Sequence, residues 1–154
     1  MLDSKTILAP AKLNIFLKVL NKRIDEYHSL RTGITFIDLF DKIEIKKSDE
    51  TKIKYKGFFK PKNNYYNDCI ILKTLNFLDL DKNLYFDITV TKNIPVQGGL
   101  GSASTNAAGL IKGLNDMNYI RQKEPSAYVS IGSDIPSFLF AKNCIITGKG
   151  EKIL

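Results

Sequence analysis

Glycines and small hydroxyl residues gather in residues 94–108, which read IPVQGGLGSASTNAA. Gly98, Gly99 and Gly101 allow positive φ angles and a close approach of the backbone to a ligand. The small residues that follow can open a helix, whose first N–H groups lack intrahelical partners and whose dipole adds about half a positive charge. The segment is typical of a phosphate-binding loop, although a glycine-rich turn that only connects two elements has the same composition.

Two charged residues in apolar surroundings are candidates for acid–base chemistry. Asp134 lies in IGSDIPSFL, where partial desolvation could adjust a carboxylate for use as a base. The alternative is an N-cap for a short helix with Pro136 in its first turn. Lys12 begins an apolar stretch in PAKLNIFL, and its alternative is an edge lysine that reaches solvent.

The single histidine limits the other chemistries. His28 follows Tyr27, and this aromatic pair is suited to stacking on a base and hydrogen-bonding to it, although a lone loop histidine is commonly a solvated residue. One histidine supports no Ser-His-Asp triad, and there is no His or Cys pair at metal-ligand spacing. Hydrolase and metalloenzyme functions are therefore disfavoured.

The glycine-rich segment must be positioned by the elements on either side. Residues 84–90 alternate apolar and polar side chains, which predicts a strand. Apolar residues between positions 107 and 114 recur at helical spacing, so a helix should follow the loop. The chain lacks both the third glycine of a dinucleotide-binding fingerprint and the Gly-Lys-Ser/Thr ending of a P-loop. Three residues could provide the N-cap of the helix: Ser102, Ser104 and Thr105.

Strands dominate the first half of the sequence and helices the second. Residues 5–20 predict two extended pieces joined at Ala9 and Pro10, with Ile15, Leu17 and Val19 on one face, and residues 21–32 predict a loop. Three short antiparallel strands are expected at 34–36, 43–45 and 53–55. A helix over 71–78, a short helical piece at 127–131 and a strand at 144–147 complete an α+β pattern.

Composition indicates one globular domain with an excess of basic residues. The 154 residues carry a net charge of +7, which suits a nucleotide, a phosphate ester or nucleic acid. The dispersed lysines favour a solvated surface over a nucleic-acid face. Cys69 and Cys144 stand alone, which indicates neither zinc nor a disulfide framework. No apolar run has the length of a membrane span and no signal peptide is evident, so we expect a cytoplasmic protein that does not bind membranes.

Three separated stretches together resemble the GHMP small-molecule kinases. These are PAKLNIFLKVLNKRIDEYHSL, IPVQGGLGSASTNAA, and IGSDIPSFL with GKGE. The branch of the family most similar to them acts on a cytidine diphosphate ester in the non-mevalonate isoprenoid pathway. The resemblance implies an ATP-dependent kinase that uses Mg²⁺. It also implies a fold like the second domain of ribosomal protein S5, with a mixed sheet and helices on one face.

The resemblance also implies roles for particular residues. Asp134 would remove the proton of the acceptor hydroxyl, and Lys12 would be its catalytic partner. Asn14, Tyr27 and His28 would bind the substrate, with the aromatic pair on the cytosine ring, and the region of Asn67 and Asp68 would line the adenine pocket. Ser104 is a candidate Mg²⁺ contact. The loop expected to hold the ATP phosphates comprises Pro95, Val96, Gln97, Gly98, Gly99, Leu100, Gly101, Ser102, Ala103, Ser104 and Thr105.

Departures from the family pattern leave alternatives open. Gln97, Ser102 and Ala103 stand where the cytidine-substrate kinases have glycine. A second hypothesis is therefore a mevalonate- or homoserine-kinase-like function. Glu26 and Ser133 replace a glycine and an alanine beside the expected site residues. Family members continue into a second domain that closes over the acceptor. Residues 1–154 are therefore expected to be an N-terminal domain in which ATP binding is retained more readily than catalytic turnover. A third hypothesis is a basic nucleic-acid-binding module similar to the second domain of ribosomal protein S5.

Overall fold

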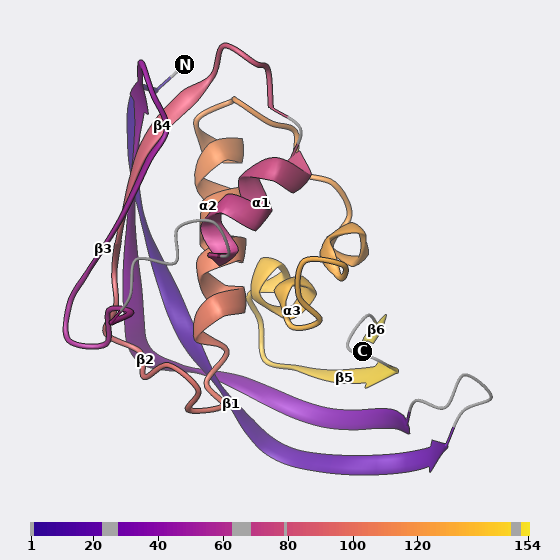
Figure 1. Ribbon diagram of the computed structural model, residues 1–154. Helices are drawn as coiled ribbons and strands as arrows, with labels where there is room; N and C mark the ends of the chain where they lie inside the picture. The colour runs from indigo at the N-terminus through magenta and orange to yellow at the C-terminus, as the bar shows by residue number, and fades with distance from the viewer. Residues whose placement is uncertain (1, 23–27, 63–68, 79, 149–151) are drawn as a thin grey trace.

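A mixed sheet with helices packed on one face forms the body of the protein (Figure 1). The computed structural model describes residues 2–22, 28–62, 69–78, 80–148 and 152–154. The strands are β1 (Ser4–Lys22), β2 (His28–Ser48), β3 (Lys52–Lys56), β4 (Tyr85–Thr91), β5 (Cys144–Gly148) and β6 (Lys152–Ile153). The helices are α1 (Ile70–Leu78), α2 (Ser102–Asp116), α3 (Ile135–Phe140) and a 3-10 turn at Pro125–Tyr128. This arrangement confirms the α+β class.

The sheet has the order β3-β4-β2-β5-β6, and β1 pairs along β2. β3 runs parallel to β4, whereas every other pair in the described chain is antiparallel. The sequence-based expectation of an antiparallel first half is therefore wrong for β3. The reason is connectivity, since α1 lies between these two strands in the chain and a parallel pair needs such a crossover.

β2 is one long strand where the sequence predicts a loop and two short strands. The stretch 38–42, which contains the polar residues Asp38, Asp41 and Lys42, does not end the strand, because β2 pairs with β1 on one side and with β4 and β5 on the other. The register changes at this point: Pro10 lies opposite Phe40, and Ala11 lies opposite Ile37. The ladder therefore accommodates the polar residues with a bulge instead of a turn.

α2 lies directly on the sheet, and most of its residues are buried. Gly109 and Gly113 face β2, where an added Cβ would lie 2.6 Å from Ile43 Cδ1 and 2.4 Å from Ile45 Cδ1 respectively. These two glycines permit the close approach. Buried apolar residues of the sheet, α1 and α2 form the main cluster: Ala9, Ile43, Ile45, Ile71, Leu75, Phe86, Ile88, Val90, Leu110, Leu114 and Met117.

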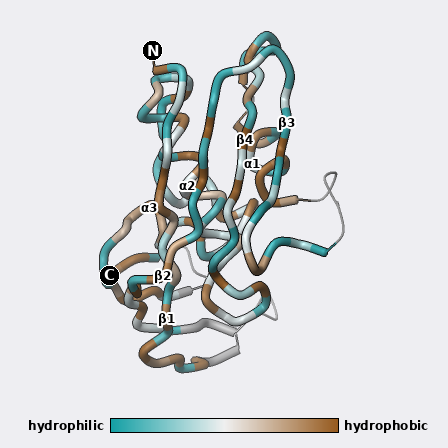
Figure 2. Tube along the Cα trace, turned by 90° about the vertical axis from the view of Figure 1, so that its left-hand side faces the viewer, coloured by the Kyte–Doolittle hydropathy of each residue, from teal (hydrophilic) through white to brown (hydrophobic). Residues whose placement is uncertain are grey.

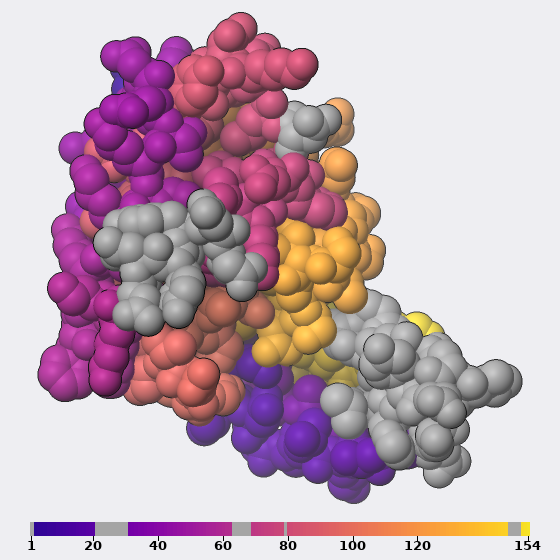
Figure 3. All heavy atoms as spheres, in the orientation of Figure 1, coloured from indigo at the N-terminus to yellow at the C-terminus, as the bar shows by residue number. Residues whose placement is uncertain are grey.

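The far half of the β1–β2 pair extends beyond the helices as an arm, at the bottom of Figures 1 and 3. The β1 strand of this arm is rich in apolar residues, which Figure 2 colours brown, and these residues are exposed. The exposed residues are Leu13, Ile15, Phe16, Leu17, Val19 and Leu20. Within the part of the chain that the structure describes, no helix is long and apolar enough to cross a membrane.

Candidate active site

The glycine-rich loop between β4 and α2 takes positive φ angles at two of the three predicted glycines, Gly99 and Gly101, and at Gln97 instead of Gly98. Gln97, Gly99 and Gly101 take φ angles of 64°, 71° and 72°. α2 begins at Ser102 with Gly101 as N-cap and without a side-chain cap, so the predicted hydroxyl cap is wrong. The Ser102 hydroxyl instead donates to Asp41 Oδ2 over 3.4 Å, which removes it from the capping position.

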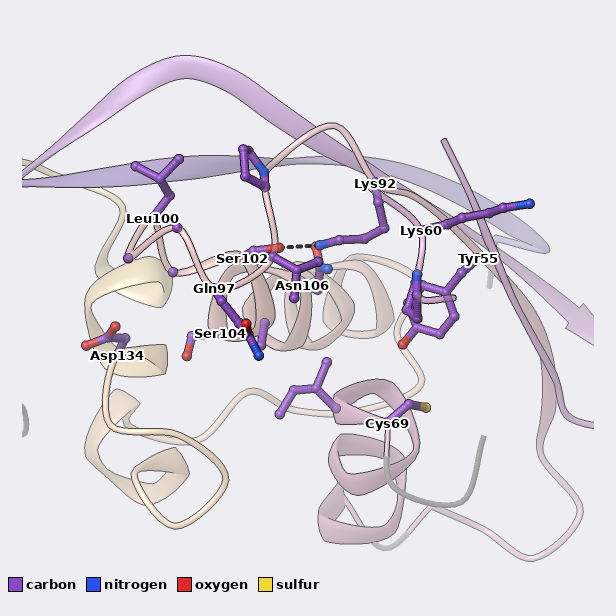
Figure 4. A pocket seen from close by; sticks show the side chains of 18 of the residues that line it. Tyr55, Lys60, Cys69, Lys92, Gln97, Leu100, Ser102, Ser104, Asn106 and Asp134 are labelled. Carbon is purple, nitrogen blue, oxygen red and sulfur yellow. Dashed lines mark hydrogen bonds between the residues drawn. The ribbon is translucent and has the colours of Figure 1, made fainter. Parts of the chain in front are cut away.

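This loop lines a cavity of about 820 Å³ (Figure 4). The size lies within the range of small-molecule sites, about 300–1,000 Å³. Every residue from Pro95 to Ser104 contributes to the wall. Thr105 does not, because its side chain is buried beneath the helix start. The structure thus brings ten of the eleven predicted loop residues to one cavity.

Other elements complete the wall with residues that the sequence analysis missed. β3 supplies Tyr55, and the chain near the start of α1 supplies Cys69 and Ile70. Burial, with a hydrogen bond to Cys69, raises the pKa of the Tyr55 hydroxyl above its ordinary range. Asn106 lies one turn beyond Ser102, so helical spacing could have found it. The remaining residues missed are Lys60, Pro61, Lys62, Lys73 and Lys92.

Asn106 is a buried polar residue in the wall of the cavity. The residue is 1% exposed, and among the described residues its Oδ1 has no hydrogen-bond partner. A buried polar atom without a partner costs about 1–3 kcal/mol, which a ligand that donates a hydrogen bond would offset. Asn106 is therefore a residue of the cavity wall whose Oδ1 could accept a hydrogen bond from a polar ligand.

Lys12 and Asp134 meet across 122 positions of sequence. Lys12 Nζ lies 3.0 Å from Asp134 Oδ2. Lys12 is 6% exposed, so it is not an edge lysine that reaches solvent. Asp134 occupies the N-cap position of α3, yet its side chain makes no capping bond and points to the lysine instead. Asp134 also lines the cavity and lies at one end of it (Figure 4), and Lys12 contacts this carboxylate.

β1 links this pair to the glycine loop. The Lys12 backbone N–H donates to the Leu100 carbonyl over 3.0 Å, and Lys12 Nζ also donates to Asn14 Oδ1 over 3.3 Å. Gly101 lies between the Lys12 stem and α3, where an added Cβ would be 2.5 Å from Phe138 Cζ. One residue thus positions both the carboxylate and the middle of the loop.

Several predicted site residues lie outside the described part of the chain. These include Tyr27, together with Asn67 and Asp68; for His28 only the backbone is described, at the start of β2. Within the described residues, no group of three or more His, Cys, Asp or Glu side chains could hold a metal ion. A divalent cation here would need phosphate oxygens as ligands.

Known proteins with similar sequences identify the family of this chain. The sequence model of the family described as "GHMP kinases N terminal domain" matches residues 69–141, which include the loop, α2 and Asp134. A 4-diphosphocytidyl-2-C-methyl-D-erythritol kinase from Psychromonas ingrahamii is 38% identical over 99% of this chain and 56% of its own length. The chain carries a GHMP kinase N-terminal domain. The resemblance seen in the three sequence stretches is confirmed.

Further relatives and solved structures agree with this GHMP assignment. The kinase of the same name from Fervidobacterium nodosum is 40% identical over 94% of the chain and 52% of its own length. A crystal structure of 4-(cytidine 5'-diphospho)-2C-methyl-D-erythritol kinase matches with a TM-score of 0.80 at 24% identity, over 97% of this chain and 54% of that one. The mevalonate kinase of Methanococcus jannaschii gives a TM-score of 0.57 at 20% identity, over 97% and 55% respectively. The GHMP domain thus spans about half the length of the relatives that it matches.

Proposed function

We propose that this GHMP domain binds ATP and supplies the catalytic pair for phosphorylation of a hydroxyl of 4-diphosphocytidyl-2-C-methyl-D-erythritol, a step of the non-mevalonate isoprenoid pathway. The observation that carries the proposal is the Lys12–Asp134 pair at one end of a cavity walled by the glycine loop. The names of the relatives support the choice of acceptor.

The cavity fits a nucleoside triphosphate. At Gly99 an added Cβ would meet nothing within 4 Å, so the loop backbone is open toward the space beside it. Its N–H groups and the start of the 15-residue α2 favour anionic oxygens. Lys60 and Lys62 also line the cavity, and their charge suits a polyanionic ligand. At the other end Tyr55 and Ile70 provide an apolar wall for the base.

Phosphoryl transfer would proceed at the end that holds the ion pair. Asp134 accepts the hydroxyl proton as the acceptor oxygen bonds to the γ-phosphorus and the bond to the β,γ-bridging oxygen breaks, so that ADP leaves. Lys12 holds the carboxylate in place and stabilises the negative charge that develops on the attacking oxygen. Proton removal by a positioned base contributes roughly 10²–10⁴ in rate, and positioning of the phosphates supplies the rest.

Mg²⁺ would neutralise charge on the phosphates when bound. Ser104 is the loop residue that would hold it, since its side chain lines the cavity between Gln97 and Asp134 in Figure 4. Most of the remaining ligands would be phosphate oxygens, as is usual for Mg²⁺ at kinase sites.

Phosphorus NMR of the chain with Mg-ATP tests the proposal. One tube contains 4-diphosphocytidyl-2-C-methyl-D-erythritol and a parallel tube contains mevalonate. We expect ADP and a new phosphomonoester in the first tube alone. Turnover only with mevalonate would assign another GHMP acceptor. If both tubes are silent, titration with Mg-ATP decides whether the domain binds nucleotide, and failure to bind would refute the proposal.

A further inference from the structure

Asp41 is a buried carboxylate that the phosphoryl-transfer chemistry above does not use. It lies on β2, opposite Ala9 of β1 and next to Lys42, which begins the ladder with β4. Its exposure is 0%. Because burial of an ionised carboxylate is costly unless it is paired and hydrogen-bonded, its contacts indicate what it holds in place.

One oxygen of Asp41 binds the beginning of the glycine loop. Oδ1 accepts the backbone N–H of Asn93 over 2.7 Å and the N–H of Ile94 over 2.9 Å. The Asn93 side chain adds a third link, since its Nδ2 donates to the Phe40 carbonyl over 2.9 Å. The first residues of the loop are therefore fastened to β2.

The other oxygen binds the end of the loop. Oδ2 accepts the Ser102 hydroxyl, on the first residue of α2, and contacts Lys92 Nζ. Lys92 Nζ also donates to Ser102 Oγ, so the three side chains form a closed network (Figure 4 shows the lysine–serine bond). Lys92 is 3% exposed, and burial lowers its pKa against the opposing effect of Asp41.

We propose that Asp41 is a positioning residue that ties the two ends of the glycine loop together, so that its N–H groups converge on phosphate before the nucleotide arrives. Lys92 balances the charge of Asp41 and bridges it to Ser102. The effect on catalysis is preorganisation, because a loop already held in its bound shape loses less conformational freedom on binding. The nucleotide readout below rests on the proposed function, whereas the hydrogen-exchange readout does not.

Hydrogen exchange of the ligand-free chain tests the tie directly. The reporters are the N–H groups of Lys12 and Thr105, which donate to the carbonyls of Leu100 and Gly101 and do not touch Asp41. In Asp41→Asn we expect both reporters to exchange at least tenfold faster, while amides in the middle of α2 keep their rates. Asp38→Asn, an exposed carboxylate on the same strand, is the matched control and should change neither set.

Asp41→Asn leaves the buried Lys92 without a counter-charge, which could unfold the whole domain. A second variant therefore tests the tie without leaving an unpaired buried charge. Asp41→Asn/Lys92→Met removes both charges together, and its reporters should also exchange faster while α2 stays protected. Unchanged reporters in this folded variant, or an equal rise at reporters and α2, would overturn the proposal.

Nucleotide binding separates positioning from simple stabilisation. Asp41→Asn should weaken Mg-ATP at least tenfold but change adenosine binding less than twofold, because only the phosphates use the loop. An equal loss for both ligands would contradict the proposal. If the unmodified chain binds no ATP, the proposed function fails, and the exchange result still decides the role of Asp41.

Discussion

Gly99 and Gly101 share a left-handed backbone but differ in the space around them. An added Cβ at Gly99 meets nothing within 4 Å, whereas at Gly101 it would lie 2.5 Å from Phe138 and 3.1 Å from Lys12 Cγ. We expect Gly99→Ala to lower the free energy of unfolding by about 1–2 kcal/mol through backbone strain alone. Gly101→Ala should cost about 3 kcal/mol, because overpacking is added. Urea titration of the two variants measures the difference, and equal losses would contradict this account of Gly101.

Asp134→Asn separates chemistry from nucleotide binding. The amide keeps the size of the side chain but cannot accept the hydroxyl proton, so phosphoryl transfer should fall by a factor of at least 10². Mg-ATP affinity should change less than threefold, because the glycine loop is untouched. Rapid-quench assays of transfer and calorimetry of binding give the two numbers. Normal turnover in this variant would remove Asp134 from the mechanism.

Residue types alone anticipated only part of the site. The positive φ angles at Gly99 and Gly101 follow from glycine chemistry, and both residues were named. The pairing of Lys12 with Asp134 followed only from the family resemblance, because 122 positions separate the two and no spacing rule joins them. The role of Asp41 could not be predicted from the sequence, because a carboxylate next to other charged residues is typical of a solvated surface. Its burial depends on the loop that folds over it.

At the scale of elements, the contact between α2 and β2 should be sensitive to single methyl groups. Gly113→Ala improves helix propensity by about 1 kcal/mol. Its new Cβ would nevertheless lie 2.4 Å from Ile45 Cδ1, so we expect a net loss of about 1–2 kcal/mol in the free energy of unfolding.

Ile45→Val removes that δ-methyl group and provides the matched background. In this background Gly113→Ala should cost less, because the contact of its Cβ with Ile7 Cγ1 at 3.2 Å is the tightest that remains, and thermal unfolding of the four proteins completes a double-mutant cycle. Additive losses would show that the two side chains do not collide and would refute the interpretation of Gly113 as a packing glycine.

Periodicity located the elements whose patterns are local. The strand predicted at 84–90 corresponds to β4, and the helix predicted after the loop corresponds to α2, because each buries one face and its apolar residues recur at the matching spacing. β2 was divided wrongly because its continuity depends on pairing with β1, β4 and β5, which no local pattern in the sequence shows. The parallel pairing of β3 was missed for the same reason, since register with β4 depends on the crossover through α1.

Stability of the whole molecule should decline at alkaline pH partly through Cys144. Burial raises the pKa of this thiol above its ordinary value of 9.0. The unfolded chain therefore loses the proton first, so the contribution of Cys144 is fully present below pH 9.0 and is lost as pH rises through the folded pKa. We expect Cys144→Val to flatten the pH dependence of unfolding in the alkaline range above that pH.

Ile146→Val is the control, because it lies in the same small cluster as Cys144 and has no proton to lose. It should lower the free energy of unfolding by a similar amount at every pH. Urea titrations across the pH range compare the variants. An unchanged slope in Cys144→Val would assign the alkaline loss to other groups.

We expect the apolar arm to promote association of this chain with itself along the edge of β1. Among the described residues β2 is the only strand that pairs with β1, and the other edge of β1 lies beside exposed apolar side chains such as Leu17, which is 56% exposed. Such edges recruit further strands unless a charge interrupts them. Leu17→Lys should shift the chain toward monomer in sedimentation velocity, whereas Phe58→Lys, an exposed site away from the arm, should not. Purified on its own, this chain would then be limited in concentration by edge-to-edge aggregation rather than by loss of its fold.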